Sequence, residues 1–267
     1  MNEQYGLQLI DEFLKVLISN PFKKNDELIL SVLSTLNNLS YYYTAEFDRD
    51  IFHIKQVDIM EAISEYVNCQ NVDCVIEAIR ILGNLSRSKI TRSYVIQKNI
   101  FSQLIKILDE DNLNLLKTTV GVFVNLMADN KNRVLFKNSG GTGKLIRILN
   151  QYGSYDWVLT MLICQVLWNF CIDTVNLYEL ISDNEMQQLL SILADFLDEE
   201  KLFGITDTNE DLEIYSAPDY MIWEEFANVA TNLLEKIEHF LDTLEQIESA
   251  GNIKTKDSNT NLSFAAW

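Results

Sequence analysis

Glycine, proline and histidine are scarce in this chain of 267 residues, which contains 9 glycines, 2 prolines and 2 histidines. Folds built from many short strands need turn residues at regular intervals, so this scarcity argues against an all-β protein and favours long helices. His53 and His239 lie far apart and have no cysteine or carboxylate cluster at metal-ligand spacing. Because no common hydrolase or metalloprotease motif occurs either, we predict a non-enzymatic protein with no metal and no cofactor.

Basic residues are also few, with 21 Lys and Arg against 39 Asp and Glu and a net charge of −18. Such a chain repels nucleic-acid phosphates and anionic membrane surfaces, so we expect neither nucleic acid nor a membrane as a partner. The excess of acidic residues is unevenly distributed, because residues 195–248 alone hold 16 acidic and 2 basic side chains.

The sequence shows no secretory signal and no hydrophobic run that could span a bilayer. Its start, "MNEQYGLQLIDEF", lacks a basic region followed by an unbroken apolar stretch. The most apolar window, residues 158–172, is too short to span a bilayer and contains Gln165 and Asn169. The four cysteines lie in apolar helical contexts, which predicts reduced core thiols in a cytoplasmic protein.

Two short patterns recur in step along the chain. Apolar five-residue cores begin at residues 13, 59, 104, 145 and 189, at spacings of 46, 45, 41 and 44. Each is followed by a segment with a central asparagine, and these asparagines are Asn38, Asn84, Asn125, Asn169 and Asn232. A period of about 40–47 residues is typical of HEAT or armadillo helical repeats.

Each unit is predicted to contain a short helix, a second helix and a long third helix. The third helices are expected at 26–41, 72–87, 112–128, 156–172 and 219–247, with Pro218 in a favoured first-turn position. We therefore predict an all-α, right-handed α-solenoid of about five armadillo-like repeats. The repeats would be residues 1–43, 44–87, 88–128, 129–172 and 173–247, with an acidic insertion at 198–218 and a disordered tail at 248–267.

The segment "NSGGTGKL" invites comparison with a phosphate-binding loop, but it fails the required pattern. The first glycine of G-x-x-x-x-G-K-[ST] would fall on Asn138, and Leu145 stands where a metal-binding hydroxyl is needed. We predict no nucleotide binding and a solvent-facing Lys144. Gly140 and Gly141 are instead interpreted as a corner between two short helices that needs positive φ, with Asn99 at the equivalent place in the preceding unit.

The motif "KLIRIL" followed by a long asparagine-bearing helix resembles the armadillo repeat, over about residues 7–240. In the second half, "GVFVNLMADNKNRVLFKNSGGTGKLIRIL" and "WEEFANVATNLLEKIE" resemble the C-terminal region of the armadillo repeat-containing protein 2 family, whose members are longer than this chain. This resemblance implies a cytoplasmic and ciliary or flagellar adaptor that links radial-spoke components to intraflagellar transport.

The five recurring asparagines, which we call the asparagine ladder, have two open interpretations. The resemblance to peptide-binding armadillo proteins implies that Asn38, Asn84, Asn125, Asn169 and Asn232 hold the backbone of an extended ligand, since an amide both donates and accepts. Alternatively, each asparagine braces neighbouring backbone within the protein. Four residues before the ladder, nuclear-import armadillo proteins carry tryptophan, whereas this chain has Ser34, Arg80, Gly121, Gln165 and Asn228. This difference argues against the rival hypothesis, a transport receptor or scaffold that binds basic peptides in its concave groove.

The acidic insertion also has two interpretations, a solvated loop or a segment that contacts a partner through Leu202, Phe203 and Tyr215. Trp157, Trp168 and Trp223 are predicted to pack into the core, because aromatic side chains on helices usually do so.

Overall fold

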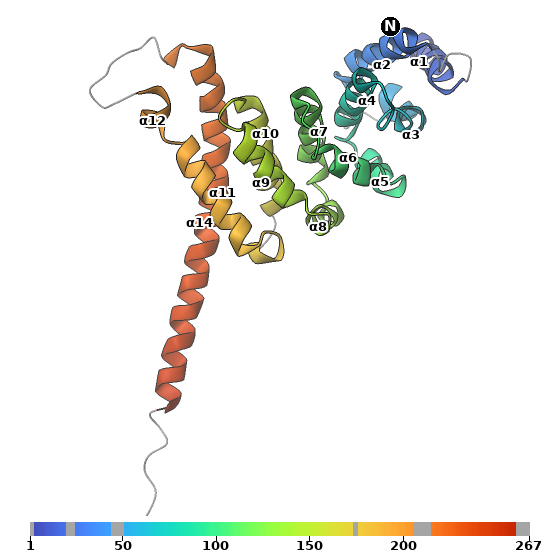
Figure 1. Cartoon of the computed structure of the whole chain (residues 1–267). Helices are drawn as coiled ribbons and strands as arrows, with labels where there is room; N and C mark the ends of the chain where they lie inside the picture. The colour runs from blue at the N-terminus through green and yellow to red at the C-terminus, as the bar shows by residue number, and fades with distance from the viewer. Residues whose placement is uncertain (1–2, 20–24, 44–50, 173–175, 205–214, 260–267) are drawn as a thin grey trace, which may run out of the picture.

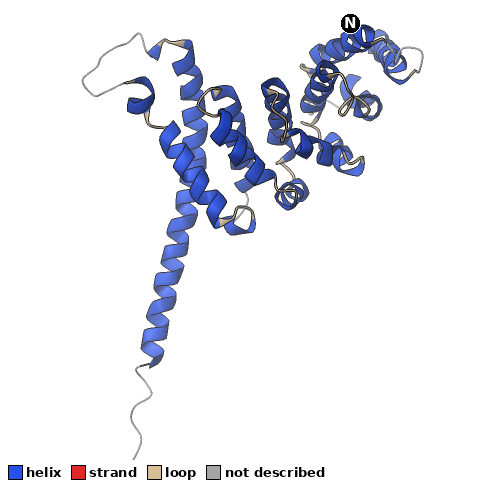
Figure 2. Cartoon of the chain, viewed as in Figure 1, coloured by secondary structure: helices blue, strands red, loops and turns tan. Residues whose placement is uncertain are grey.

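The computed structural model describes residues 3–19, 25–43, 51–172, 176–204 and 215–259 (Figure 1). Every regular element in these ranges is a helix, as Figure 2 shows by colour. The all-α prediction is therefore confirmed, and the helices are arranged as an armadillo-type solenoid.

Five long helices form a row that runs through the protein. They are α2 (Asp26–Ser40), α4 (Val72–Leu85), α7 (Leu113–Leu126), α10 (Trp157–Cys171) and α14 (Pro218–Asn259), and each contacts the next. All five begin within one residue of the predicted third helices. The last one extends beyond the predicted boundary at 247, because adding residues to an existing helix costs little and no proline interrupts it. Residues 260–267 of the predicted tail lie outside the described ranges.

An asparagine or aspartate side chain sets the start of each of the first four long helices. The Oδ1 atoms of Asn25, Asn71, Asn112 and Asp156 accept hydrogen bonds from backbone N–H groups in the following turn. Such caps satisfy amides that have no partner inside the helix and each stabilise it by about 1 kcal/mol.

The remaining helices pack against this row. They are α1 (Glu3–Ile18), α3 (Ile51–Ser64), α5 (Lys89–Gln97), α6 (Ile100–Ile107), α8 (Asn130–Asn138), α9 (Gly141–Tyr152), α11 (Asp183–Phe196) and the short η1 (Leu177–Glu179) and α12 (Glu199–Phe203). The groups α5–α6–α7 and α8–α9–α10 are the complete three-helix units that the repeat pattern predicts.

The glycine cluster is the corner between α8 and α9, as predicted from the sequence. Gly140 has a φ of 71°, and Asn99 has a φ of 57° at the equivalent corner between α5 and α6. Gly141 has another role, because a Cβ atom there would lie 2.5 Å from the Phe136 ring. The prediction that Lys144 faces solvent is wrong. Its side chain is 23% exposed and pairs with Asp109 of the preceding unit.

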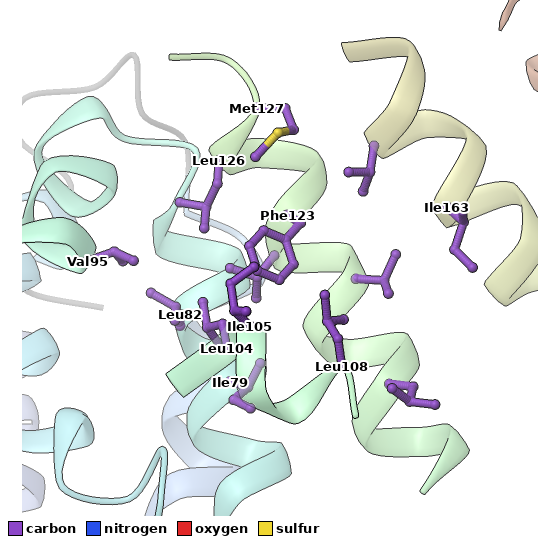
Figure 3. Close-up of a cluster of buried hydrophobic side chains, with 14 of the residues drawn as sticks. Ile79, Leu82, Val95, Leu104, Ile105, Leu108, Phe123, Leu126, Met127 and Ile163 are labelled. Carbon is purple, nitrogen blue, oxygen red and sulfur yellow. The ribbon is translucent and has the colours of Figure 1, made fainter. Parts of the chain in front are cut away.

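The core is continuous from one repeat to the next. The rings of Phe101, Phe123, Phe136 and Phe170 form a chain with centroid separations of 5.5, 5.0 and 5.7 Å. Figure 3 shows Phe123 in one cluster with Leu104 of its own unit and with apolar side chains of both neighbouring units, Leu82 and Ile163. Packing of this kind joins the repeats because each helical face is covered by the next unit.

The predicted core tryptophans also pack inward. Trp157 stacks on Phe226 with a centroid distance of 5.3 Å, and Trp223 donates a hydrogen bond from Nε1 to the Phe196 carbonyl at 2.9 Å. Trp168 is half-buried against the core. None of the helices within the described ranges combines the length and apolar character needed to cross a membrane.

Candidate protein-binding groove

A groove with a volume of about 560 Å³ runs across three of the long helices, α2, α4 and α7. Its lining includes the two central ladder residues, Asn84 and Asn125, together with Gly121 and other residues of α7 between Lys117 and Asn125. We call it the ladder groove.

Three ladder asparagines connect consecutive repeats. The Nδ2 atom of Asn84 donates to the Asn37 carbonyl at 3.3 Å, that of Asn125 to the Gly83 carbonyl at 3.0 Å, and that of Asn169 to the Val124 carbonyl at 3.0 Å. Each acceptor lies in the last turn of the preceding long helix. The bracing therefore links each repeat to the one before it, across the interface between two helices.

The other end of each of these amides remains free to contact a ligand. Within the described ranges, Oδ1 of Asn84, Asn125 and Asn169 accepts no hydrogen bond, and none of these atoms is among the buried unpaired ones. A backbone N–H of another chain could bond to such an oxygen without disturbing the brace. Bracing and ligand contact are thus compatible at the same residue.

The two ends of the predicted ladder differ from its middle. Asn38 is exposed and its side chain makes no hydrogen bond with any described residue, whereas its neighbour Asn37 donates from Nδ2 to Glu77 at 3.0 Å. Asn232 is also exposed and donates to the Asn228 carbonyl of its own helix at 2.9 Å. The structure therefore brings together Asn84, Asn125 and Asn169 as inter-repeat braces but does not place Asn38 or Asn232 in that role.

The lining of the ladder groove is cationic, which the sequence analysis did not predict. It contains Arg80, Arg87 and Lys117 and no acidic side chain. Arg80 pairs with Glu77 at 2.7 Å and Lys117 with Asp156 at 2.9 Å. The negative net charge of the whole chain gives no indication of this local positive charge. In the sequence, the one indication was Arg80, the basic residue four positions before the ladder residue Asn84.

Arg87 differs from the other two cations in how it is held. Its Nη1 atom donates to the carbonyls of Tyr41 and Tyr43, at 3.3 and 2.8 Å. Within the part of the chain that the structure describes, it has no carboxylate partner. Among these described residues, its positive charge is therefore held in position by backbone carbonyls and is not paired with a carboxylate.

The predicted anchors in the acidic insertion take part in packing within the protein. Leu202 and Phe203 are half-buried against the core, and the Phe203 ring lies 5.2 Å from the rings of both Tyr220 and Trp223. Tyr215 is 41% exposed and lies 5.1 Å from the Tyr220 ring. The insertion residues 205–214 lie outside the described ranges.

A hydrogen bond also ties α12 to the last long helix. The hydroxyl of Tyr220 donates to Glu199 at 2.7 Å, and burial together with this bond raises the pKa of Tyr220 well above its usual range. The start of the acidic insertion is therefore anchored to α14 by both aromatic packing and a charged hydrogen bond.

The acidic, histidine and cysteine side chains of the described ranges can be compared with what a metal site or a reactive thiol requires. No group of three or more His, Cys, Asp or Glu side chains there has a geometry that could hold a metal ion. The four cysteines are free, and burial raises the pKa values of Cys164 and Cys171 to about 12. Such thiols stay protonated at neutral pH and are poor nucleophiles.

Comparison with known sequences points to one set of relatives. Armadillo repeat-containing protein 2 of Bos taurus is 33% identical over 241 residues, which is 90% of this chain and 27% of that protein. The protein of the same name from Homo sapiens is 34% identical over 224 residues, 83% of this chain and 25% of that protein. The chain therefore spans about a quarter of the length of the curated relatives it matches. No protein-family model matches the sequence.

Solved structures with the same architecture include designed proteins. The designed armadillo repeat protein YIII(Dq)4CqI has a TM-score of 0.55 and 14% identity, and the match covers 84% of this chain and 98% of that one. A second design, YIII(Dq.V1)4CPAF in complex with the peptide (KR)4, has a TM-score of 0.54, 14% identity and the same coverage. At this level of identity the likeness establishes the fold alone.

Proposed function

Because the chain belongs to the armadillo-repeat family, we propose that it is a non-enzymatic adaptor that holds a protein partner in the ladder groove. The observation that carries this proposal is the pair of accessible Oδ1 atoms on Asn84 and Asn125, which line an open groove beside a fixed cation. An armadillo scaffold has no need of a reactive group, since its long helices already present a continuous surface to another chain.

The finer part of the proposal concerns the partner and the place. We propose that the chain carries radial-spoke components for intraflagellar transport, in the cytoplasm and in the cilium or flagellum. The support is the similarity to armadillo repeat-containing protein 2 over 83–90% of the chain, together with the ciliary role which that resemblance implies.

Depletion of the protein in a flagellated cell tests this proposal. We expect axonemes that keep their doublet microtubules and dynein arms but lose radial spokes, as seen by cryo-electron tomography and by immunoblotting of isolated axonemes. A fluorescent fusion should restore the spokes and move along the axoneme together with transport trains. Intact spokes after complete depletion, or a fusion that never enters the flagellum, would overturn the ciliary assignment.

The rival function, binding of basic peptides, is opposed by the charges in the groove. Arg80, Arg87 and Lys117 line the space that such a peptide would occupy, and like charges in close contact weaken binding. Direct titration with the peptide (KR)4 separates the two hypotheses. We expect no saturable binding in the ladder groove.

A further inference from the structure

The charged residues that line the ladder groove are basic, whereas the protein as a whole is acidic. The chain carries a net charge of −18, yet the groove is lined by Arg80 of α4, Arg87 of the turn after α4 and Lys117 of α7, and by no acidic side chain. Arg80 and Lys117 pair with carboxylates outside the lining, Glu77 and Asp156, so Arg87 is the lining cation without a carboxylate partner among the described residues. A cationic cleft in an acidic surface attracts anionic segments locally while the remaining surface repels them, which confines such a segment to the cleft.

Arg87 is prepared to receive a carboxylate. Two backbone carbonyls from the preceding repeat hold its Nη1 atom, at 3.3 and 2.8 Å. Its Nε and Nη2 groups have no partner within the described ranges. These two groups form one edge of the planar guanidinium, and such an edge binds both oxygens of a carboxylate at once. Because the side chain is already positioned, little conformational entropy is lost when the carboxylate binds.

Gly121 provides a second, independent observation. It lies inside α7, where glycine is less stable than alanine, and it lines the ladder groove. Its φ is not positive, and a Cβ atom built on it would meet no atom within 4 Å apart from its chain neighbours and the backbone of its own helix. Neither backbone geometry nor packing therefore requires glycine here. The missing side chain leaves open space on the floor of the groove, where another backbone can approach α7 closely.

We propose that the ladder groove binds an extended acidic segment of a partner protein. A carboxylate of this segment pairs with the free edge of Arg87, and its backbone N–H groups donate to Oδ1 of Asn84 and Asn125. Its main chain passes over Gly121. This inference rests on the adaptor function proposed above and names the chemical class of the partner's binding segment.

Binding of synthetic peptides to the full chain tests the chemistry. Three fluorescein-labelled peptides of about ten residues would be compared by fluorescence anisotropy, with Glu, Gln or Lys alternating with Ser. We expect the Glu peptide to bind, with an affinity that falls as salt rises, and the Gln and Lys peptides to bind at least about tenfold more weakly. Equal binding of the Gln and Glu peptides, or preference for the Lys peptide, would overturn the proposal.

Two substitutions in the chain test the location, with a matched control. Arg87→Glu should weaken binding of the Glu peptide by at least about tenfold. Lys131→Glu makes the same charge change on the exposed side of α8, away from the groove, and should leave binding nearly unchanged. Gly121→Ala should raise Tm by about 1–4 °C and yet weaken binding. Equal losses in Arg87→Glu and Lys131→Glu would show an effect of net charge alone, and tighter or unchanged binding by Gly121→Ala would also contradict the model.

The failure of this inference can be told apart from failure of the adaptor function. In the depleted flagellated cells, full restoration of radial spokes by folded Arg87→Glu and Gly121→Ala chains would remove the groove as the binding surface and leave the adaptor role standing. If the wild-type chain itself fails to restore the spokes while it binds the Glu peptide in vitro, the groove chemistry stands and the ciliary cargo is wrong.

Discussion

Replacing Asn125 with alanine is expected to destabilise the protein through a defined pair of contacts. Its Nδ2 atom donates to the Gly83 carbonyl and to the Ser86 hydroxyl, both at 3.0 Å. The Gly83 carbonyl keeps a second partner, the Ser86 hydroxyl at 2.7 Å, so no acceptor is left entirely unpaired. Two lost hydrogen bonds at about 0.5–1.5 kcal/mol each, without the full penalty of a buried orphan, give a loss of about 1–3 kcal/mol.

This loss should be visible in thermal unfolding followed by circular dichroism. For a protein of this size, 1 kcal/mol corresponds to about 2–4 °C, so Tm should fall by about 2–12 °C. Affinity of the folded variant for the Glu peptide should fall as well, because the same substitution removes the accessible Oδ1 atom. The interface between the second and third repeats is the region that loosens, and amide exchange in the last turn of α4 should increase.

Two other ladder positions provide the comparison. Asn38 is exposed and has no hydrogen-bond partner in the described ranges, so Asn38→Ala should change stability by less than about 0.5 kcal/mol. Asn169 makes one hydrogen bond, to the Val124 carbonyl at 3.0 Å, and Asn169→Ala should cost about 1 kcal/mol. If Asn38→Ala lowers Tm as much as Asn125→Ala, or if Asn125→Ala leaves Tm unchanged, the bracing argument is refuted.

Further predictions concern the corner, the lysine beside it, the insertion and the buried thiols. Gly140→Val should cost about 1–3 kcal/mol, because its φ of 71° strains a β-branched residue, and equal stability in urea denaturation would contradict this. Lys144→Ala should cost less than about 1 kcal/mol, since its partner Asp109 is 54% exposed, and calorimetry should detect no ATP binding in either protein. Phe203→Ala should lower Tm through lost packing on Tyr220 and Trp223, whereas a residue that served only a partner would leave Tm unchanged. Burial raises the pKa of Cys164 from 9.0 to about 12, so the folded state keeps a proton that the unfolded chain loses. Its contribution to stability is therefore complete below about pH 9 and declines above it, and Cys164→Ala should flatten this decline in pH-dependent melting.

The fold was predictable because its determinants are local. Apolar residues at three- and four-residue spacing can only be buried on one face of a helix, and their recurrence every 41–46 residues implies stacking of equivalent units. The corner was predictable for a similar reason. Positive φ is open to glycine and tolerated by asparagine, so Gly140 and Asn99 at matching places indicated the same turn before any tertiary contact was known.

The detail within that corner was less predictable. The two adjacent glycines have different reasons for being glycine, since Gly140 has positive φ and Gly141 makes room for the Phe136 ring. A close approach depends on which side chain arrives from another helix, and sequence order does not show this. The same limit explains Lys144, whose partner Asp109 belongs to the preceding repeat.

By itself, the sequence determined the helices, their repeat length and the recurring asparagines, because these depend on residues that are close along the chain. Only the tertiary structure decided what those asparagines do. The Nδ2 atom of Asn125 reaches a carbonyl 42 residues earlier, and Arg87 is held by Tyr41 and Tyr43, more than 40 residues before it. The positive charge of the groove lining also depends on tertiary structure. Stacking brings Arg80 of α4, Arg87 of the turn after it and Lys117 of α7 into one lining, and a total charge of −18 contains no information about which few side chains will share a surface.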